Sequence, residues 1–189
     1  MNNTLKMVSA LQYLQQNQDI DPDYFLFTDD DSYVNVKLLH KKISEDIPWF
    51  YEDMNKDLAI IGSKFAGGIL RPDPVDDYPF VRRSICPEYM WPDEMYPPFL
   101  SGAGFLVPYK ALDCLATTSM NLPLLHIDDV FITGVVAEEC DIERIDSHDF
   151  TPGRKELKEL YKNLLVIHYA DSSYMQAYHK YFYPSKYSH

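Results

Sequence analysis

Acidic side chains, and in one case a histidine, follow three short apolar segments of this sequence. In chain order the junctions are residues 24–27 (YFLF) before Asp29-Asp30-Asp31, residues 124–127 (LLHI) before Asp128-Asp129, and residues 164–167 (LLVI) before His168. Alternate side chains of an extended segment face the same side, so Asp29 and Asp31 can present two carboxylates together. Carboxylate oxygens suit Mg²⁺ or Mn²⁺, which keep positions open for substrate phosphates. The pattern predicts a metal site, with a solvated acidic turn as the alternative.

The second and third junctions offer a base and a further metal ligand. One carboxylate of Asp128-Asp129 could accept the proton of an attacking hydroxyl. An aspartate directly before a helix is also a common N-cap, and both roles fit if Asp128 caps the helix while Asp129 reaches into the site. His168 could complete the metal site if a second partner orients its neutral ring. The alternative for His168 is an ordinary histidine.

Hydrophobic runs and helical periodicities alternate along the chain and indicate the elements that must hold these residues. The predicted helices cover residues 4–17, 35–45, 110–120 and 130–139, and the predicted strands include residues 24–27, 58–61, 124–127, 142–145 and 164–167. Residues 66–100 are rich in Gly, Pro, Asp and aromatics and are typical of a long ordered loop region. The alternation predicts an α/β layered fold. Ligands of such sheets bind at the carboxyl ends of strands, so the three junctions should meet in one crevice.

The same patterns predict how individual residues face. The core-facing residues of the first two helices should be Leu5, Val8, Leu11, Leu14, Val36, Leu39 and Ile43. The segment Ser101-Gly102-Ala103-Gly104 reads as a small-residue turn that runs into a strand ending at Val107. Its glycines would let the backbone approach a ligand closely.

Composition excludes several classes of protein. The 189 residues carry a net charge of −12, which argues against nucleic acid or anionic membrane surfaces as partners. No apolar run reaches the ~18 residues that a membrane span needs. The three cysteines form no CxxC motif, which argues against a zinc site; one disulfide is possible, with its pairing open.

Taken in order, four segments resemble the beta-1,3-galactosyltransferase-like family of hexosyltransferases, which includes beta-1,3-galactosyl- and beta-1,3-N-acetylglucosaminyltransferases. The segments are residues 24–35 (YFLFTDDDSYVN), 96–105 (YPPFLSGAGF), 127–134 (IDDVFITG) and 164–168 (LLVIH). Each motif alone is modest, but their order over about residues 3–175 makes coincidence improbable. Two departures are Ala103, where the family usually has glycine, and Pro108 after that strand.

The resemblance implies a fold and an activity. The fold would be a GT-A-type nucleotide-diphospho-sugar transferase, a mixed sheet flanked by helices with the first nucleotide-binding strands missing. Residues 1–189 would be a single partial catalytic domain with a peripheral tail at residues 176–189. The activity would be inverting transfer of galactose or an N-acetylhexosamine from a UDP-sugar, with Mn²⁺, to a glycan acceptor on a glycoprotein or glycolipid in beta-1,3 linkage. The native protein would be anchored upstream in the Golgi membrane and face the lumen.

The resemblance also implies roles for individual residues. Asp129 would be the catalytic base, and Asp29, Asp31 and His168 would be the metal ligands, with Asp31 favoured as the direct ligand. The residues expected to line the donor and acceptor pocket are Asp30, Tyr96, Phe99, Ser101, Gly102, Ala103, Gly104 and Asp128.

Two other functions fit parts of the same sequence. A catalytically inactive truncated relative would keep the fold and bind a glycan or a partner without turnover. A metal-dependent hydrolase or phosphoesterase would also use clustered carboxylates, but the lack of further His/Asp metal clusters in the sequence disfavours it.

Overall fold

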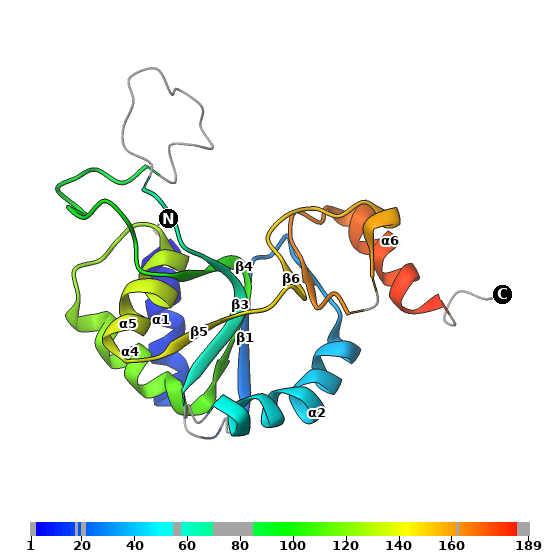
Figure 1. The fold of residues 1–189 in the computed structure, drawn as a ribbon, viewed down its shortest axis with the longest axis horizontal. Coiled ribbons are helices and arrows are strands. Elements are labelled where there is room, and N and C mark those ends of the chain that lie inside the picture. The colour runs from blue at the N-terminus through cyan, green and yellow to red at the C-terminus, as the bar shows by residue number, and fades with distance from the viewer. Residues whose placement is uncertain are drawn as a thin grey trace, which may run out of the picture.

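A four-stranded sheet is the centre of the larger part of the molecule, in a computed structural model that describes residues 3–17, 19, 22–54, 58–69, 85–161 and 163–184 (Figure 1). Its strands lie in the order β1 (Tyr24–Thr28), β4 (Phe99–Pro108), β3 (Ala59–Phe65) and β5 (Glu143–Asp146). β4 pairs antiparallel with β1 and with β3, whereas β3 pairs parallel with β5, so the sheet is mixed. β4 is an internal strand, and its residues 103–108 are all buried.

Helices cover both faces of this sheet. On one face lie α1 (Asn3–Gln16), the short 3-10 helix η1 (Tyr109–Ala111), α4 (Leu112–Asn121), the π-helical segment η2 (Val130–Val136) and α5 (Ala137–Glu139), and on the other lies α2 (Val36–Met54). Successive side chains of a strand point to opposite faces. Phe105 and Val107 of β4 therefore belong to the core under α1 and α4, whereas Leu106 belongs to the core under α2. This arrangement confirms the predicted α/β layers.

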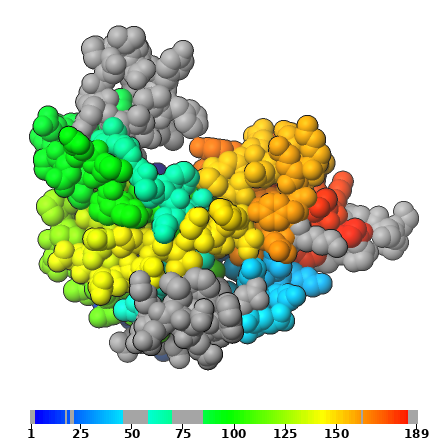
Figure 2. Space-filling view, in the orientation of Figure 1, coloured from blue at the N-terminus to red at the C-terminus, as the bar shows by residue number. Residues whose placement is uncertain are grey.

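A second, smaller sheet lies beside the first and carries the last part of the chain. Its strands lie side by side in the order β2 (Tyr33–Val34), β7 (Val166–Ile167) and β6 (Phe150–Thr151). Along the chain, the 3-10 helix η3 (Leu157–Glu159) lies between β6 and β7, and α6 (Ser172–Phe182) follows β7. A Cβ atom added to Gly104 would lie 3.0 Å from Val166 Cγ1, so β4 passes very close to β7. In the space-filling view the orange to red residues of this second lobe form a bulge beside the green to yellow body (Figure 2).

The tail beyond residue 175 is not merely peripheral. α6 lies at the far end of the second lobe (Figure 1). Tyr178 of this helix is nevertheless fully buried, and its ring packs edge-on against Tyr33 of β2 at 5.6 Å. The tail therefore contributes to the second hydrophobic core, and residues 185–189 lie outside the described residues.

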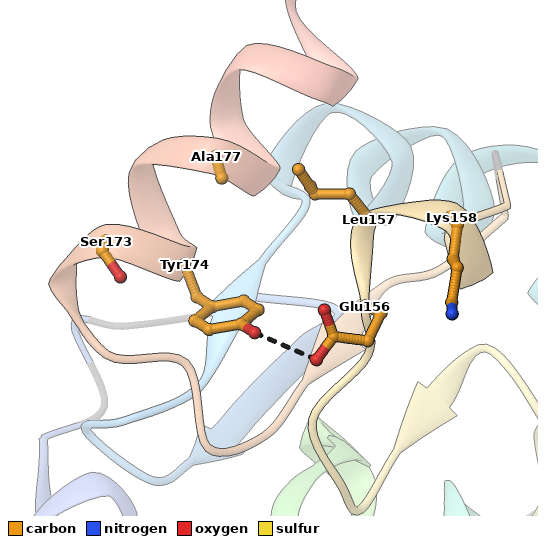
Figure 3. A pocket seen from close by; sticks show the side chains of 6 residues that line it. All are labelled: Glu156, Leu157, Lys158, Ser173, Tyr174 and Ala177. Atoms are coloured by element: carbon orange, nitrogen blue, oxygen red, sulfur yellow. Dashed lines mark hydrogen bonds between the residues drawn. The ribbon is translucent and has the colours of Figure 1, made fainter.

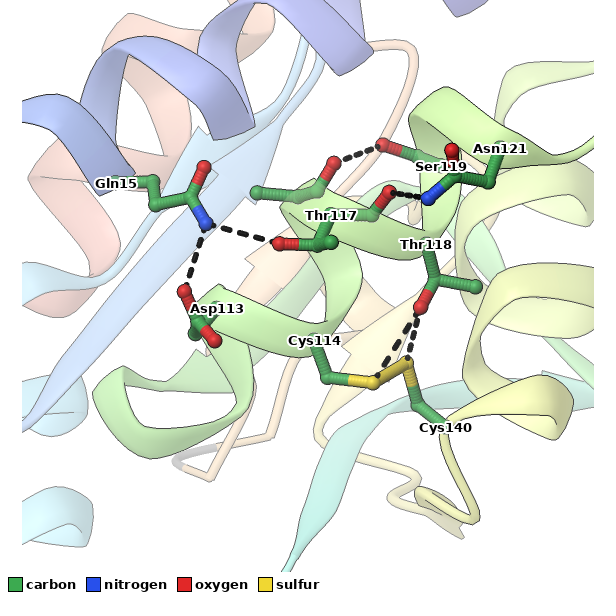
Figure 4. The surroundings of a disulfide bond; sticks show 9 residues. Gln15, Asp113, Cys114, Thr117, Thr118, Ser119, Asn121 and Cys140 are labelled. Carbon is green, nitrogen blue, oxygen red and sulfur yellow. Dashed lines mark hydrogen bonds between the residues drawn. A yellow bond between two sulfur atoms is a disulfide. The ribbon is translucent and has the colours of Figure 1, made fainter.

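One disulfide joins the helices on the first face of the large sheet. It pairs Cys114 of α4 with Cys140, the residue after α5, and leaves Cys86 buried elsewhere. The Oγ1 atom of Thr118 lies 3.5 Å from Cys114 Sγ and 3.4 Å from Cys140 Sγ (Figure 4). The sequence left the pairing of the cysteines open. The structure shows that it depends on the contact between two helices that are separated in the chain.

Three local predictions were wrong. Residues 124–127 do not form a strand; they are irregular, and the Thr4 hydroxyl donates to the carbonyl of Leu125 at 2.7 Å. Residues 101–104 form no turn, because they belong to β4. Leu5 is 49% exposed because Thr4, which bonds Leu125, takes the inward position of α1.

One further prediction changes at the start of α2, and β1 lies at the edge of its sheet. Val36 is 65% exposed, because Asn35 occupies the buried position and its Oδ1 accepts the backbone N–H of Leu38. Leu39 and Ile43 face the core as predicted. The strand ahead of the three aspartates is an edge strand, and its residues 24–27 are only partly buried. None of the helices in the described ranges combines the length and hydropathy that a membrane span requires.

Candidate active site

Two carboxylates and one imidazole meet where the two sheets adjoin. Asp29 and Asp31 follow β1, and His168 follows β7 of the other sheet. His168 Nε2 lies 3.3 Å from Asp29 Oδ2 and 3.0 Å from Asp31 Oδ1. One ligand atom from each residue lies within 4.8 Å of the others, so the three form a group that could hold a metal ion. The predicted convergence of these residues is confirmed, although it joins strands of two sheets rather than one.

The loop that carries the two aspartates is fastened to β4. The hydroxyls of Thr28 and Ser32 both donate to the carbonyl of Ala103, each at 2.8 Å. The backbone N–H of Ala170 donates to the carbonyl of Asp31 at 2.8 Å, which ties the loop to the segment after His168. These bonds fix both carboxylates relative to the imidazole without using the carboxylate oxygens.

The histidine ring is oriented by a backbone carbonyl. His168 Nδ1 lies 3.2 Å from the carbonyl oxygen of Pro152. A carbonyl only accepts, so Nδ1 donates. When the ring is neutral, its lone pair is therefore at Nε2, facing the two aspartates. Lone pairs and carboxylates gathered at one point repel each other unless a proton or a cation lies between them. The donor set therefore fits a divalent cation that accepts oxygen and imidazole ligands.

Asp129 lies on the other side of Gly102 and is held by two backbone groups. Its Oδ1 accepts the N–H of Val130 at 2.8 Å, and its Oδ2 accepts the N–H of Gly102 at 3.1 Å. Asp129 is thus itself the N-cap of the helical segment that begins there, a role that the sequence had given to Asp128. It caps the helix and faces the site at once.

The two carboxylates nearest Gly102 are electrostatically perturbed. Burial raises the pKa of Asp129 to about 6, the bond from Gly102 opposes this shift, and the charge of Asp128 adds to it. Partial burial also raises the pKa of Asp29, although a protonated His168 ring opposes this rise. Carboxyl groups with raised pKa values that share a cleft are typical of functional sites.

One cavity of about 210 Å³ is lined by Asp129 and by two members of the metal-competent group, Asp29 and His168, whereas Asp31 does not line it. The residues that line it are Asn3, Asp29, Ser101, Gly102, Ala103, Asp128, Asp129, Pro152, His168 and Tyr169. A Cβ atom added to Gly102 would lie 3.7 Å from Asp129 Oδ2 and 3.8 Å from Asp29 Oδ2, so this glycine separates the two carboxylates by backbone alone. A side chain larger than a methyl at residue 102 would fill the space between them.

Comparison with known proteins decides the family. Residues 1–148 match the family model described as Galactosyltransferase. The chain belongs to the galactosyltransferase family. Its resemblance to beta-1,3-galactosyltransferases, drawn above from four motifs, is thereby confirmed at the level of the family.

Individual relatives of the family agree with this placement. The chain is 27% identical to Beta-1,3-galactosyltransferase brn of Drosophila melanogaster over 88% of its own length and 48% of the relative's. It is 24% identical to Beta-1,3-galactosyltransferase 1 of Homo sapiens, over 77% of this chain and 41% of that protein. It is 26% identical to Beta-1,3-galactosyltransferase bre-5 of Caenorhabditis elegans, over 79% and 42%. The chain spans about half the length, or less, of these galactosyltransferases.

Four residues that the motifs placed in the galactosyltransferase pocket do not line the cavity that holds Asp129. Asp30 is exposed in the loop, and Gly104 packs against Val166 of β7. The Tyr96 ring lies edge-on to Phe99 at 6.4 Å, and the Phe99 ring stacks on Phe65 at 5.8 Å. Contact of these four residues with a sugar donor or acceptor stays a prediction.

Three lining residues were not predicted from the sequence. Asn3 begins α1, Pro152 contributes its carbonyl to His168, and Tyr169 stacks on the His168 ring at 3.9 Å. The only signal for Tyr169 was its place directly after the predicted metal ligand. Pro152 acts through its backbone, which its residue type does not reveal.

Proposed function

We propose that this protein transfers a hexose, galactose or an N-acetylhexosamine, from a UDP-sugar to a glycan hydroxyl in beta-1,3 linkage with inversion of the anomeric carbon. The observation that carries the proposal is one cavity lined by Asp129, Gly102, Asp29 and His168, in which the last two form the metal-competent group together with the neighbouring Asp31. A base and a cation site in one cleft suit a displacement in which a hydroxyl attacks while a diphosphate leaves. The names of the related galactosyltransferases support the sugar and the linkage.

We propose Mn²⁺ as the ion for the metal-competent group. Asp29, Asp31 and His168 would hold it through two carboxylates and the Nε2 atom that the bond to Pro152 leaves available. A bound divalent ion would neutralise the charge that develops on the UDP leaving group. Three protein ligands leave coordination positions open for phosphate oxygens.

Asp129 acts as the base in this proposal. Its pKa of about 6 leaves the carboxylate mostly ionised at neutral pH, yet more basic than an exposed aspartate. The two backbone N–H donors hold the carboxylate in one orientation while it takes the proton of the acceptor hydroxyl. Direct attack of that hydroxyl from the opposite face of the sugar inverts the anomeric centre in one step, as in inverting hydrolysis.

We also propose a secretory-pathway location, on the lumenal side of the Golgi membrane. The disulfide between Cys114 and Cys140 supports an oxidising compartment, since such bonds are rare in the cytosol. The Golgi itself is inferred from the family resemblance.

Substitution of the base and of the metal ligands tests the proposed function. Asp129→Asn should lower transfer from UDP-galactose or a UDP-N-acetylhexosamine by about 10²–10⁴-fold and leave Mn²⁺-dependent UDP binding nearly unchanged. Asp31→Ala and His168→Ala should weaken that binding by at least about tenfold. Transfer is measured by mass spectrometry of a glycan acceptor library, and UDP binding by calorimetry.

Asp113→Asn is the matched control, because Asp113 is an exposed aspartate on α4 outside the cavity. Unchanged turnover in Asp129→Asn would remove Asp129 from the role of base. Glycan binding by the unmodified chain with no transfer from any donor would favour the inactive binding module instead.

A further inference from the structure

A second cavity lies in the smaller lobe, between η3 and the first turns of α6. Its volume is about 390 Å³, and Figure 3 shows the six side chains around it. They are Glu156, Leu157, Lys158, Ser173, Tyr174 and Ala177. None of them takes part in the chemistry proposed for Asp129, so the cavity needs an explanation of its own.

The lining of this cavity combines an aromatic ring with both apolar and charged groups. Leu157, Ala177 and the ring of Tyr174 offer apolar surface, while Glu156 and Lys158 carry opposite charges. The Tyr174 hydroxyl donates to Glu156 Oε1 at 3.0 Å, which holds the ring and the carboxylate together (Figure 3). A saccharide has C–H faces that pack on a ring and hydroxyls that bond carboxylates and ammonium groups. The chemistry of the cavity therefore suits a sugar unit better than a wholly apolar ligand.

Arg154 connects this cavity to the one that contains Asp129. Its Nε donates to the carbonyl of Tyr169 at 2.9 Å, and its guanidinium carbon lies 4.5 Å from the centre of the Tyr174 ring. Tyr169 lines the first cavity and Tyr174 lines the second. One arginine thus bridges the two tyrosine-bearing walls.

The chain limits how far apart the two cavities can be. Pro152 lines the first cavity and Glu156 the second, four residues later. Four residues span at most ~14 Å even when fully extended. A short oligosaccharide can therefore reach from one cavity to the other.

Tyr169, which lines the first cavity, has an unusual backbone conformation. It is one of two non-glycine residues with positive φ among those described, at 53°, and is 41% exposed. The left-handed conformation is unfavourable for a residue with a side chain, and here it coincides with stacking of the ring on His168 at 3.9 Å. Such strain often accompanies a functional position.

We propose that the second cavity is an acceptor subsite, which binds an inner sugar of an oligosaccharide whose terminal hydroxyl lies at Asp129. The glycan would run from Tyr169 past Arg154 to the Tyr174 ring. This inference rests on the proposed transfer function and adds that the enzyme distinguishes acceptors by their length.

Filling the cavity tests the subsite. Leu157→Trp places a larger side chain at a position that is already 48% exposed, so the fold should tolerate it. The donor is UDP-galactose. The terminal sugar of the acceptor is first chosen as the one that the unmodified chain prefers among galactose, N-acetylglucosamine, N-acetylgalactosamine and mannose. The acceptors are then methyl glycosides of one to four sugars that all end in this terminal sugar. The KM for the longer acceptors should rise at least about tenfold, with the KM for the single sugar and kcat unchanged.

Met120→Trp is the control, because Met120 is 60% exposed at the end of α4, away from both cavities. Equal effects of Leu157→Trp on short and long acceptors, or no effect, would overturn the subsite. A raised KM only for a single sugar carried on a peptide would show that the cavity takes peptide instead.

A binding measurement separates this proposal from the transfer function itself. Saturation-transfer NMR of the four-sugar glycoside without donor should detect binding by the unmodified chain and by Met120→Trp, with the signal lost in Leu157→Trp. If no transfer occurs but this pattern holds, the proposed function fails and the sugar-binding cavity stands. Absence of binding to the unmodified chain would overturn the cavity as a sugar site.

Discussion

At the scale of single residues, the site depends on how a few side chains are held rather than on their identity alone. Asp29, Asp31, Asp129 and His168 could be selected from the sequence because each follows an apolar run. Their geometry comes from backbone partners that no residue type announces, such as the Pro152 carbonyl that orients His168. The sequence therefore predicts which residues carry the chemistry and leaves open what fixes them.

The raised pKa of Asp129 predicts the pH dependence of transfer. In its proposed role as base, Asp129 works only when deprotonated, so kcat/KM should fall as pH drops below about 6, the pKa that burial gives this carboxyl. The neighbouring charge of Asp128 contributes to raising that pKa. Asp128→Asn should therefore move the acidic limb of the profile to lower pH, whatever its effect on the maximum rate. Initial rates from pH 5 to 8 check this; a limb that stays in place would show that another group controls the rate.

At the scale of elements, the side chain of Thr133 links β4 to the helix that starts at Asp129. Thr133 is fully buried in η2, and its Oγ1 accepts the N–H of Leu100 at 2.8 Å. The same hydroxyl lies 2.6 Å from the carbonyl of Asp129 as a donor. One side chain thus sets the position of the helix start relative to the strand.

Removal of that hydroxyl should destabilise the protein. Thr133→Val keeps the shape but leaves the buried N–H of Leu100 without this acceptor, which costs about 1–3 kcal/mol. Thr133→Ser retains the hydroxyl and should lose less. Urea denaturation of the three proteins measures the difference. Equal stability of Thr133→Val and the unmodified chain would mean that the bond contributes nothing to the fold.

Sequence patterns identified most elements but not all of their roles. Apolar residues at helical spacing correctly located α1 and α4, since burial of one face requires that spacing. The run 124–127 failed as a strand, because four apolar residues can equally fill a buried irregular segment before a helix. Strand order and the pairing of Cys114 with Cys140 depend on contacts between distant segments, which local periodicity does not contain.

At the scale of the whole molecule, the candidate site belongs to neither sheet alone. β1 and β4 carry the aspartate loop and Gly102, while β7 of the second sheet carries His168. The two sheets pack tightly where Gly104 meets Val166. The relative position of the lobes therefore determines whether the proposed metal ligands meet.

Gly104→Val should separate the two halves of the site. A Cβ atom at this position would lie 3.0 Å from Val166 Cγ1, and Val166 is fully buried, so one of the strands must move. Overpacking of this kind costs about 1–3 kcal/mol, and the shift should also weaken Mn²⁺-dependent UDP binding, because His168 follows Val166 by two residues. Gly68→Val is the matched control, since a Cβ there meets nothing within 4 Å. Calorimetric UDP titrations and thermal unfolding of both variants test the idea. Destabilisation of Gly104→Val with unchanged UDP affinity would mean that the ligands keep their geometry when the lobes move.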